Sequence, residues 1–169
     1  SIINYQDSDN YSNAVTVGGL LQANGNVEII NQEGNVEVLN ATGATIKGKN
    51  VSLQAAGDII NNNTIIAAAE AELLATNNVF NRGSINATTV NMQANTSDVV
   101  LYAGDIVANS VTMSAKRDVL LQNGSLLAGT ASLIATNGKL LQVLDANGHG
   151  HELAVDNLTV KAGNGVELA

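Results

Sequence analysis

The residues of this chain that could bind a metal ion lie close together near its C-terminal end. His149 and His151 are separated by one residue, and Asp145 and Glu152 lie within four positions of His149. Imidazole nitrogens and carboxylate oxygens are ligands of zinc and other divalent cations. The segment therefore predicts a candidate metal site formed by His149, His151, Asp145 and Glu152. The alternative is a flexible surface loop without a metal, because two glycines interrupt the segment.

A second set of polar residues recurs at intervals of 20 positions and consists of Asp58, Asn78, Asp98 and Asp118. If the intervening segments stack on one another, these side chains become neighbours about 4.8 Å apart. The carboxylates of Asp98 and Asp118 would then repel each other unless they are hydrated, paired with a base or bridged by a cation such as calcium. The alternative is a row of outward turn residues beside water, with Lys116 or Arg117 nearby.

The sequence contains no arrangement of residues typical of an enzyme. Carbohydrate-cleaving β-helices need acidic pairs close to Arg or Lys, and they surround them with long loops and aromatic residues. This chain has three Tyr, one Phe and no Trp, and Asp105 and Glu152 have no charged companions at matched positions. It also lacks a Ser-His-Asp grouping and a phosphate-binding loop. We therefore expect neither catalysis nor a cofactor, and a polysaccharide-binding or polysaccharide-cleaving β-helix stands as the alternative.

Composition excludes several other classes. The 169 residues include no cysteine, so disulfide scaffolds, zinc-thiolate sites and reactive-cysteine enzymes are ruled out. The net charge of −8 argues against a nucleic-acid partner, which would require a basic surface. No stretch approaches the roughly 18 continuous apolar residues of a membrane span. The chain begins at Ser1 without a visible targeting segment.

Internal repeats dominate the chain. Residues 50–69 read NVSLQAAGDIINNNTIIAAA and residues 70–89 read EAELLATNNVFNRGSINATT; similar copies follow at 90–109 and 110–129. The period is 20 residues with single-residue slips, and fainter copies lie before and after. Within each copy apolar residues alternate with other residues, which predicts short strands with one buried face.

Each copy contains three such strands, separated by turns rich in Gly, Asn and Ser. A unit of this size cannot bury its apolar face alone, so the copies must stack. The residues expected in the resulting core are Val51, Leu53, Ala55, Ile59, Ile65, Leu73, Val79, Ile85, Met92, Val99, Ile106, Met113, Val119, Leu126, Leu133, Leu140, Val160 and Val166.

The stack predicts an all-β parallel β-helix of about seven coils of roughly 20 residues, with three short strands in each coil. Its length would be about 34 Å at the usual spacing between strands. The absence of proline agrees with this fold, since every interior strand donates backbone hydrogen bonds to the next. We expect one repeat domain at 15–169, an irregular lead-in or cap at 1–14, and a loop insertion at about 143–155.

One window favours a different local structure. Residues 64–76, TIIAAAEAELLAT, are rich in Ala, Glu and Leu and would be assigned to a helix in isolation. The aligned windows 85–95 and 106–116 contain β-branched residues and Asn instead. Because neighbouring repeats should share one structure, we predict a strand in all three windows.

Copies such as GDIINNNTIIAAAEAELLAT and DVLLQNGSLLAGTASLIAT resemble the repeats of filamentous haemagglutinin and related two-partner secretion exoproteins. Those repeats have the general form G-x-I-x-N-x-G-x-I-x-A-x-x-x-L-x-L-x-A, and the likeness covers most of 26–169. The resemblance implies a right-handed β-helix. The Asn-Pro-Asn-Leu type motif of the secretion domain in that family is missing, so the chain would be an interior or downstream piece.

The resemblance also implies a function. It suggests a non-catalytic shaft or adhesion segment of an exoprotein that is secreted to the cell surface of a Gram-negative bacterium. The implied partners are an outer-membrane secretion protein and a receptor or glycan on a host cell or surface. The stalk of a contact-dependent inhibition protein, which delivers a toxin, is the alternative within the same family. Unpaired strand edges at the ends of the stack further predict end-to-end self-association.

Overall fold

The computed structural model describes residues 1–4 and 14–169, which form strands and turns without a helix. All strand pairings are parallel, and they join the strands into one sheet that winds into a solenoid. The strands are β1 (Ile2–Asn4), β2 (Val15–Val17), β3 (Leu20–Gln22), β4 (Asn26–Asn31), β5 (Val36–Val38), β6 (Thr45–Ala55), β7 (Ile59–Asn61), β8 (Thr64–Ala75), β9 (Val79–Asn81), β10 (Ser84–Asn86), β11 (Thr89–Ala94), β12 (Val99–Ala115), β13 (Val119–Ala135), β14 (Leu140–Val143), β15 (Glu152–Ala162) and β16 (Val166–Glu167).

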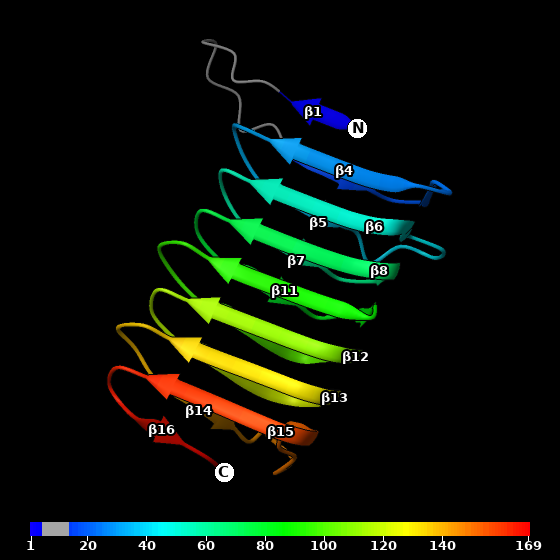
Figure 1. The fold of residues 1–169 in the computed structure, drawn as a ribbon. Coiled ribbons are helices and arrows are strands. Elements are labelled where there is room, and N and C mark those ends of the chain that lie inside the picture. Colours follow the sequence, from blue (N-terminus) through cyan, green and yellow to red (C-terminus); the bar gives the residue numbers. More distant parts are fainter. Residues whose placement is uncertain (5–13) are drawn as a thin grey trace.

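The predicted parallel stack is confirmed, with about six turns of about 21 residues. The sequence suggested about seven coils of 20 residues; the turns are longer because extra residues enter at the corners. Figure 1 shows the turns stacked in chain order, with the two labelled ends of the chain at opposite ends of the stack. No helix that could cross a membrane occurs among the described residues.

Strand register follows the repeat. Leu53 pairs with Leu73, Leu73 with Met92, Met92 with Met113, and Met113 with Leu133. Equivalent residues of successive turns therefore lie one above another. Residues in such a file share one environment, which is why the repeat keeps their polarity while allowing Leu and Met to exchange.

The predicted division into three short strands per coil is only partly correct. β12 and β13 each run through all three predicted segments and continue across the corners between them. At one corner the chain turns at residues with a positive φ, which are Ala103 in β12 (56°) and the adjacent Asn123 (51°) and Gly124 (87°) in β13. Backbone pairing with the adjacent coil of the solenoid keeps the strand extended on both sides of the corner. The chain therefore passes the corner without a separate loop.

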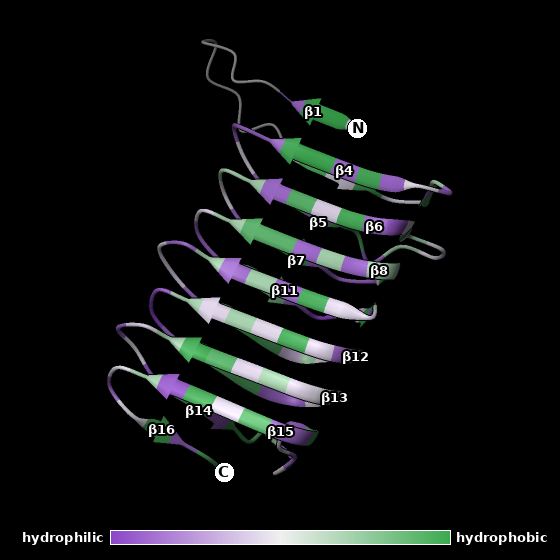
Figure 2. Ribbon diagram, viewed as in Figure 1, coloured by the Kyte–Doolittle hydropathy of each residue, from purple (hydrophilic) through white to green (hydrophobic). Residues whose placement is uncertain are grey.

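The core consists of aliphatic side chains on the inner faces of the strands. Figure 2 shows hydrophobic and hydrophilic positions alternating along the strands. Every residue expected in the core is buried except Val160 and Val166. Val160 is half-buried, and Val166 is 48% exposed. The prediction was wrong for these two because they belong to β15 and β16, and no further turn covers the outer edge of either strand.

The window with strong helix formers is a strand. Residues Thr64–Ala75 form β8, which pairs with β6 on one side and with β10 and β11 on the other. Stacking on neighbouring turns thus overrides the local helix propensity, as predicted.

Two parts of the predicted domain plan can be located. Residues 2–4 of the expected lead-in form β1, which pairs with β4, while residues 5–13 lie outside the described part of the chain. The insertion consists of residues 144–151, between β14 and β15, so Glu152 already belongs to a strand.

Candidate functional site

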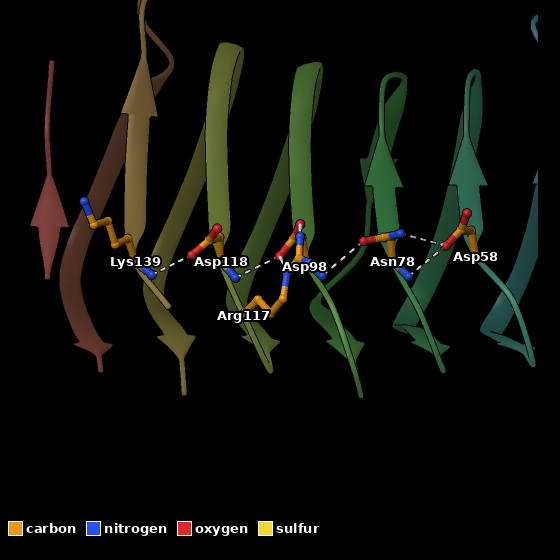
Figure 3. A network of polar contacts seen from close by, with 6 residues as sticks. All are labelled: Asp58, Asn78, Asp98, Arg117, Asp118 and Lys139. Carbon is orange, nitrogen blue, oxygen red and sulfur yellow. Dashed lines mark hydrogen bonds and ion pairs between the residues drawn. The ribbon is translucent and has the colours of Figure 1, made fainter. Parts of the chain in front are cut away.

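The recurring Asp and Asn residues form a ladder of hydrogen bonds along one corner of the solenoid, which we call the Asx ladder (Figure 3). In each case a backbone N–H donates to the side-chain Oδ1 of the equivalent residue in the preceding turn. The donor–acceptor distances are 2.9 Å for Asn78 to Asp58, 3.1 Å for Asp98 to Asn78, 2.9 Å for Asp118 to Asp98 and 2.7 Å for Lys139 to Asp118. Asn35 extends the ladder by accepting from the N–H of Asp58 at 2.7 Å.

The backbone explains why Asp or Asn occupies this position. The carbonyl oxygen of Asn78 accepts the N–H of Ile59, but the N–H of Asn78 itself meets a side chain instead of a carbonyl. A short side chain with an oxygen on Cγ is long enough to reach the next turn and satisfy this donor. Close approach also selects glycine at two points of the ladder. A Cβ on Gly138 would lie 2.2 Å from Oδ1 of Asp118, and a Cβ on Gly57 would lie 2.2 Å from Oδ1 of Asn35.

The predicted repulsion between Asp98 and Asp118 is relieved by hydrogen bonds and by a base. Arg117 donates from Nη2 to Oδ2 of Asp98 at 2.8 Å and from Nε to Oδ1 at 3.1 Å. This hydrogen bond, followed by the charge of Asp98, raises the pKa of Arg117. Lys139 forms an ion pair with Glu167 in the last turn, which likewise raises the pKa of Lys139. The arrangement matches the predicted alternative of outward turn residues with a base nearby.

The predicted metal site is not assembled. In the described part of the chain, no three His, Asp or Glu residues lie together in a group that could hold a metal ion. Asp145 and His149 do approach, with Nδ1 of His149 at 3.4 Å from Oδ2 of Asp145. His151 is buried, however, and Glu152 is exposed on β15. Spacing in the sequence does not reveal which side chains turn inward, and the four residues are therefore not gathered in this structure.

Asp145 organises the insertion rather than a metal. Its Oδ1 accepts the backbone N–H groups of Asn147 at 2.8 Å and His149 at 2.9 Å, and its Oδ2 accepts Nδ2 of Asn123 at 3.2 Å. The backbone hydrogen bond from His149, followed by that from Asn147, lowers the pKa of Asp145. The carboxylate thus stays ionised and ties the loop to β13.

His151 lies at the base of the same loop and is only 2% exposed. Neither ring nitrogen has a hydrogen-bond partner among the described residues. Burial lowers the pKa of His151, and the negative charge of Asp105 and the nearby backbone of Glu152 and Gly104 oppose part of that effect. The imidazole is therefore held neutral in a place where its polar atoms are unsatisfied, which is uncommon in a folded protein.

Sequence analysis missed a set of buried asparagines. Asn61 and Asn81 are fully buried in equivalent positions of adjacent turns, and Nδ2 of Asn61 donates to Oδ1 of Asn81 at 2.8 Å. Asn31 is also buried, and its Oδ1 accepts Nδ2 of Asn4 at 2.9 Å. The 20-residue spacing of Asn61 and Asn81 was a usable signal, but Asn is so frequent in this chain that the pair did not stand out.

Open grooves run along two corners. One of about 340 Å³ is lined by Ile30, Leu74 and several amide side chains, and one of about 400 Å³ is lined by Ile66, Val107 and small residues. Neither lining contains a titratable side chain. These grooves supply no general acid or base.

No family model, curated protein or solved structure matches this chain. What the structure establishes is the parallel β-solenoid itself.

Proposed function

We propose that this chain is a non-catalytic shaft segment of an exoprotein at the surface of a Gram-negative bacterium, of the kind whose repeats it resembles. The observation that carries the proposal is the unbroken stack, in which parallel backbone pairing joins each turn to the next and the Asx ladder adds hydrogen bonds between the turns from Asn35 to Lys139. A stack of this kind is a rod, with its chain ends at opposite extremes (Figure 1). Such a rod suits a protein that must hold a binding or toxin element away from the cell and contribute to attachment.

The proposal includes a route to the surface. A chain without cysteine can pass an outer-membrane pore in an extended state without disulfides that hinder it. Each turn contacts mainly its neighbours, so turns can fold one after another as they emerge. We therefore propose an outer-membrane secretion partner for the longer protein and a receptor or glycan as the eventual contact. Strand edges that pair on one side only, as in β15, also support end-to-end association of rods.

Surface display tests the proposal directly. The chain would be placed behind a two-partner secretion domain, produced with the matching outer-membrane protein, and tagged at its C-terminal end. We expect the tag to reach the outside of intact cells and the solenoid to resist added protease. A folded solenoid that remains in the periplasm would contradict the proposal.

A second measurement addresses the alternative from another class. Purified chain would be incubated with neutral and acidic polysaccharides in the presence of calcium, and product length would be followed by chromatography. The shaft predicts no shortening of any polysaccharide. Depolymerisation would replace the proposal with a carbohydrate-cleaving enzyme.

A further inference from the structure

Large apolar side chains are exposed in only two kinds of place on this solenoid. Eleven such side chains occur in the described part of the chain, and eight of them lie in the first turn or in the last turn, from Leu140 onward, where stacking stops. The remaining three, Tyr102, Val107 and Leu127, lie on the two sides of a single corner. Val143 and Leu144 of the last turn lie at the same corner, and we call these five residues the loop corner. Exposed apolar side chains that cluster away from the ends are typical of an interaction surface.

Register places these residues side by side. Tyr102 pairs with Gln122, which pairs with Val143, so the three form one outward file before the corner. Val107 pairs with Leu127 in a second file just beyond it. The insertion 144–151 leaves the stack between the two files, and Leu144 is its first residue.

Two further observations fall on the same corner. The only non-glycine residues with positive φ in the described chain are Ala103 and Asn123, which turn the corner in adjacent strands. A positive φ is uncommon for residues other than glycine, and for alanine in particular, and strained backbone of this kind concentrates at functional sites. His151, buried and without a hydrogen-bond partner among the described residues, lies where the insertion returns to the stack.

The charges at this corner have one sign. Asp105 and Glu152 are exposed in one file, with Ser125 between them, and Asp145 lies in the insertion. The segments 100–107, 120–127 and 141–155 contain no Lys or Arg. Arg82, in the turn before Tyr102, is the base that borders the corner, and its guanidinium lies 5.2 Å from the ring centre of Phe80.

We propose that the loop corner is a docking surface for a polypeptide segment that carries basic side chains around an apolar centre. Tyr102, Leu127 and Leu144 would contact the apolar centre, and the carboxylates of Asp105 and Glu152 would face the basic groups. A second copy of this chain is a poor occupant because its net charge is −8 and its seven Lys and Arg are scattered. Anionic lipid surfaces and acidic glycans are disfavoured for the same electrostatic reason.

The surface is inferred independently of the shaft role, and its test is separate. The probe is an 18-residue peptide that alternates leucine and lysine, and the matched control peptide alternates leucine and glutamate. Binding would be followed by backbone amide NMR shifts of the whole chain. We expect the lysine peptide to shift resonances in 100–107, 120–127 and 143–152 and the glutamate peptide to shift none of them.

Variants locate the site. Tyr102→Ser combined with Leu127→Ser should weaken binding of the lysine peptide at least tenfold, because both side chains are exposed and can be changed without disturbing the core. Leu20→Ser is the matched control, since Leu20 is equally apolar and 65% exposed but lies in the first turn. Asp105→Asn should weaken binding and reduce its dependence on salt. Circular dichroism would verify that each variant remains folded.

The outcomes separate the alternatives. Shifts spread along the whole solenoid, or equal binding by the Tyr102/Leu127 double variant, would overturn the proposal. Equal binding of the glutamate peptide would remove the electrostatic part and with it the assigned partner. A neutral oligosaccharide that shifts the same resonances when the lysine peptide does not would reassign the surface to sugars.

Discussion

At the scale of single residues, the surface asparagines and aspartates hold the turns together. Each member of the Asx ladder accepts a peptide N–H that has no carbonyl opposite it, so a polar side chain on the surface satisfies the backbone inside the stack. The sequence was sufficient to place Asp98 above Asn78 and to predict a base beside them, either Lys116 or Arg117. It could not reveal the backbone donors, because the direction of an N–H at a corner depends on the fold.

Asp98→Ala tests the ladder. The change removes the acceptor for the N–H of Asp118 and the partner of Arg117. We therefore expect the free energy of unfolding, measured in urea, to fall by about 1 to 2 kcal/mol. Asp98→Asn is the matched control, since the amide keeps Oδ1 and loses only the charge. If the asparagine variant loses as much free energy of unfolding as the alanine variant, the charge of Asp98, and not its role as a backbone acceptor, matters at this position.

His151 makes stability depend on pH. Its pKa in the folded protein lies below the ordinary value of 6.5 because the ring is buried. Below pH 6.5 the unfolded chain therefore takes up a proton that the folded chain does not, and stability falls as the pH decreases towards the folded pKa. The slope cannot exceed about 1.4 kcal/mol per pH unit for one proton. Asp105 and Glu152 favour the protonated form and reduce the effect.

Urea unfolding between pH 8 and pH 5 measures this dependence. We expect His151→Phe to remove the component between pH 6.5 and pH 5, while His149→Gln, which changes an exposed histidine of the same loop, preserves it. If both variants keep the wild-type slope, another group must be responsible for it.

At the scale of the elements, the repeat predicted strand positions better than strand limits. The file that contains Ile65, Ile85 and Ile106 was placed correctly, yet the structure joins it to the neighbouring segments in β8 and β12. Strand limits depend on whether a corner keeps its pairing with the adjacent turn. That property belongs to two turns together and cannot be read from one copy of the repeat.

Gly124 shows how tightly one corner is built. Its φ is +87°, and a Cβ would lie 2.3 Å from the carbonyl oxygen of Gly104 in the preceding turn. Gly148 in the insertion has a similar φ of +80° but open space around it. Gly148→Ala should therefore cost about 1 to 2 kcal/mol from backbone conformation alone, and Gly124→Ala should cost clearly more. Equal losses in thermal or urea unfolding would show that the corner adjusts to the added methyl group.

At the scale of the whole molecule, stability comes from contacts between successive turns, so the interior and the ends behave differently. The period predicted the interior correctly from Val51 to Leu140, because each of those residues has a turn on both sides. The period wrongly predicted that Val166 is buried. The last turn carries the same repeat pattern as the interior turns, but it has a neighbouring turn on one side only. The insertion was also visible as a break in the period, whereas the burial of His151 required the fold.

Leu73→Asp tests the cooperativity of the stack. Leu73 is fully buried in the middle of the solenoid, between Leu53 and Met92 of the adjacent turns. A carboxylate there would have no partner, and we expect a loss of more than about 3 kcal/mol. Because each turn is stabilised by its neighbours, the damage should spread, and amide exchange should accelerate first in β6, β8 and β11.

Leu74→Asp is the matched control on the same strand. Leu74 points to the surface groove, so the new carboxylate can remain hydrated and the melting temperature should change little. Circular dichroism and hydrogen exchange would compare the two variants with the unmodified chain. A Leu73→Asp variant that melts like Leu74→Asp would mean that a buried charge can be absorbed by one turn alone, and the turns would then be independent units instead of a single cooperative stack.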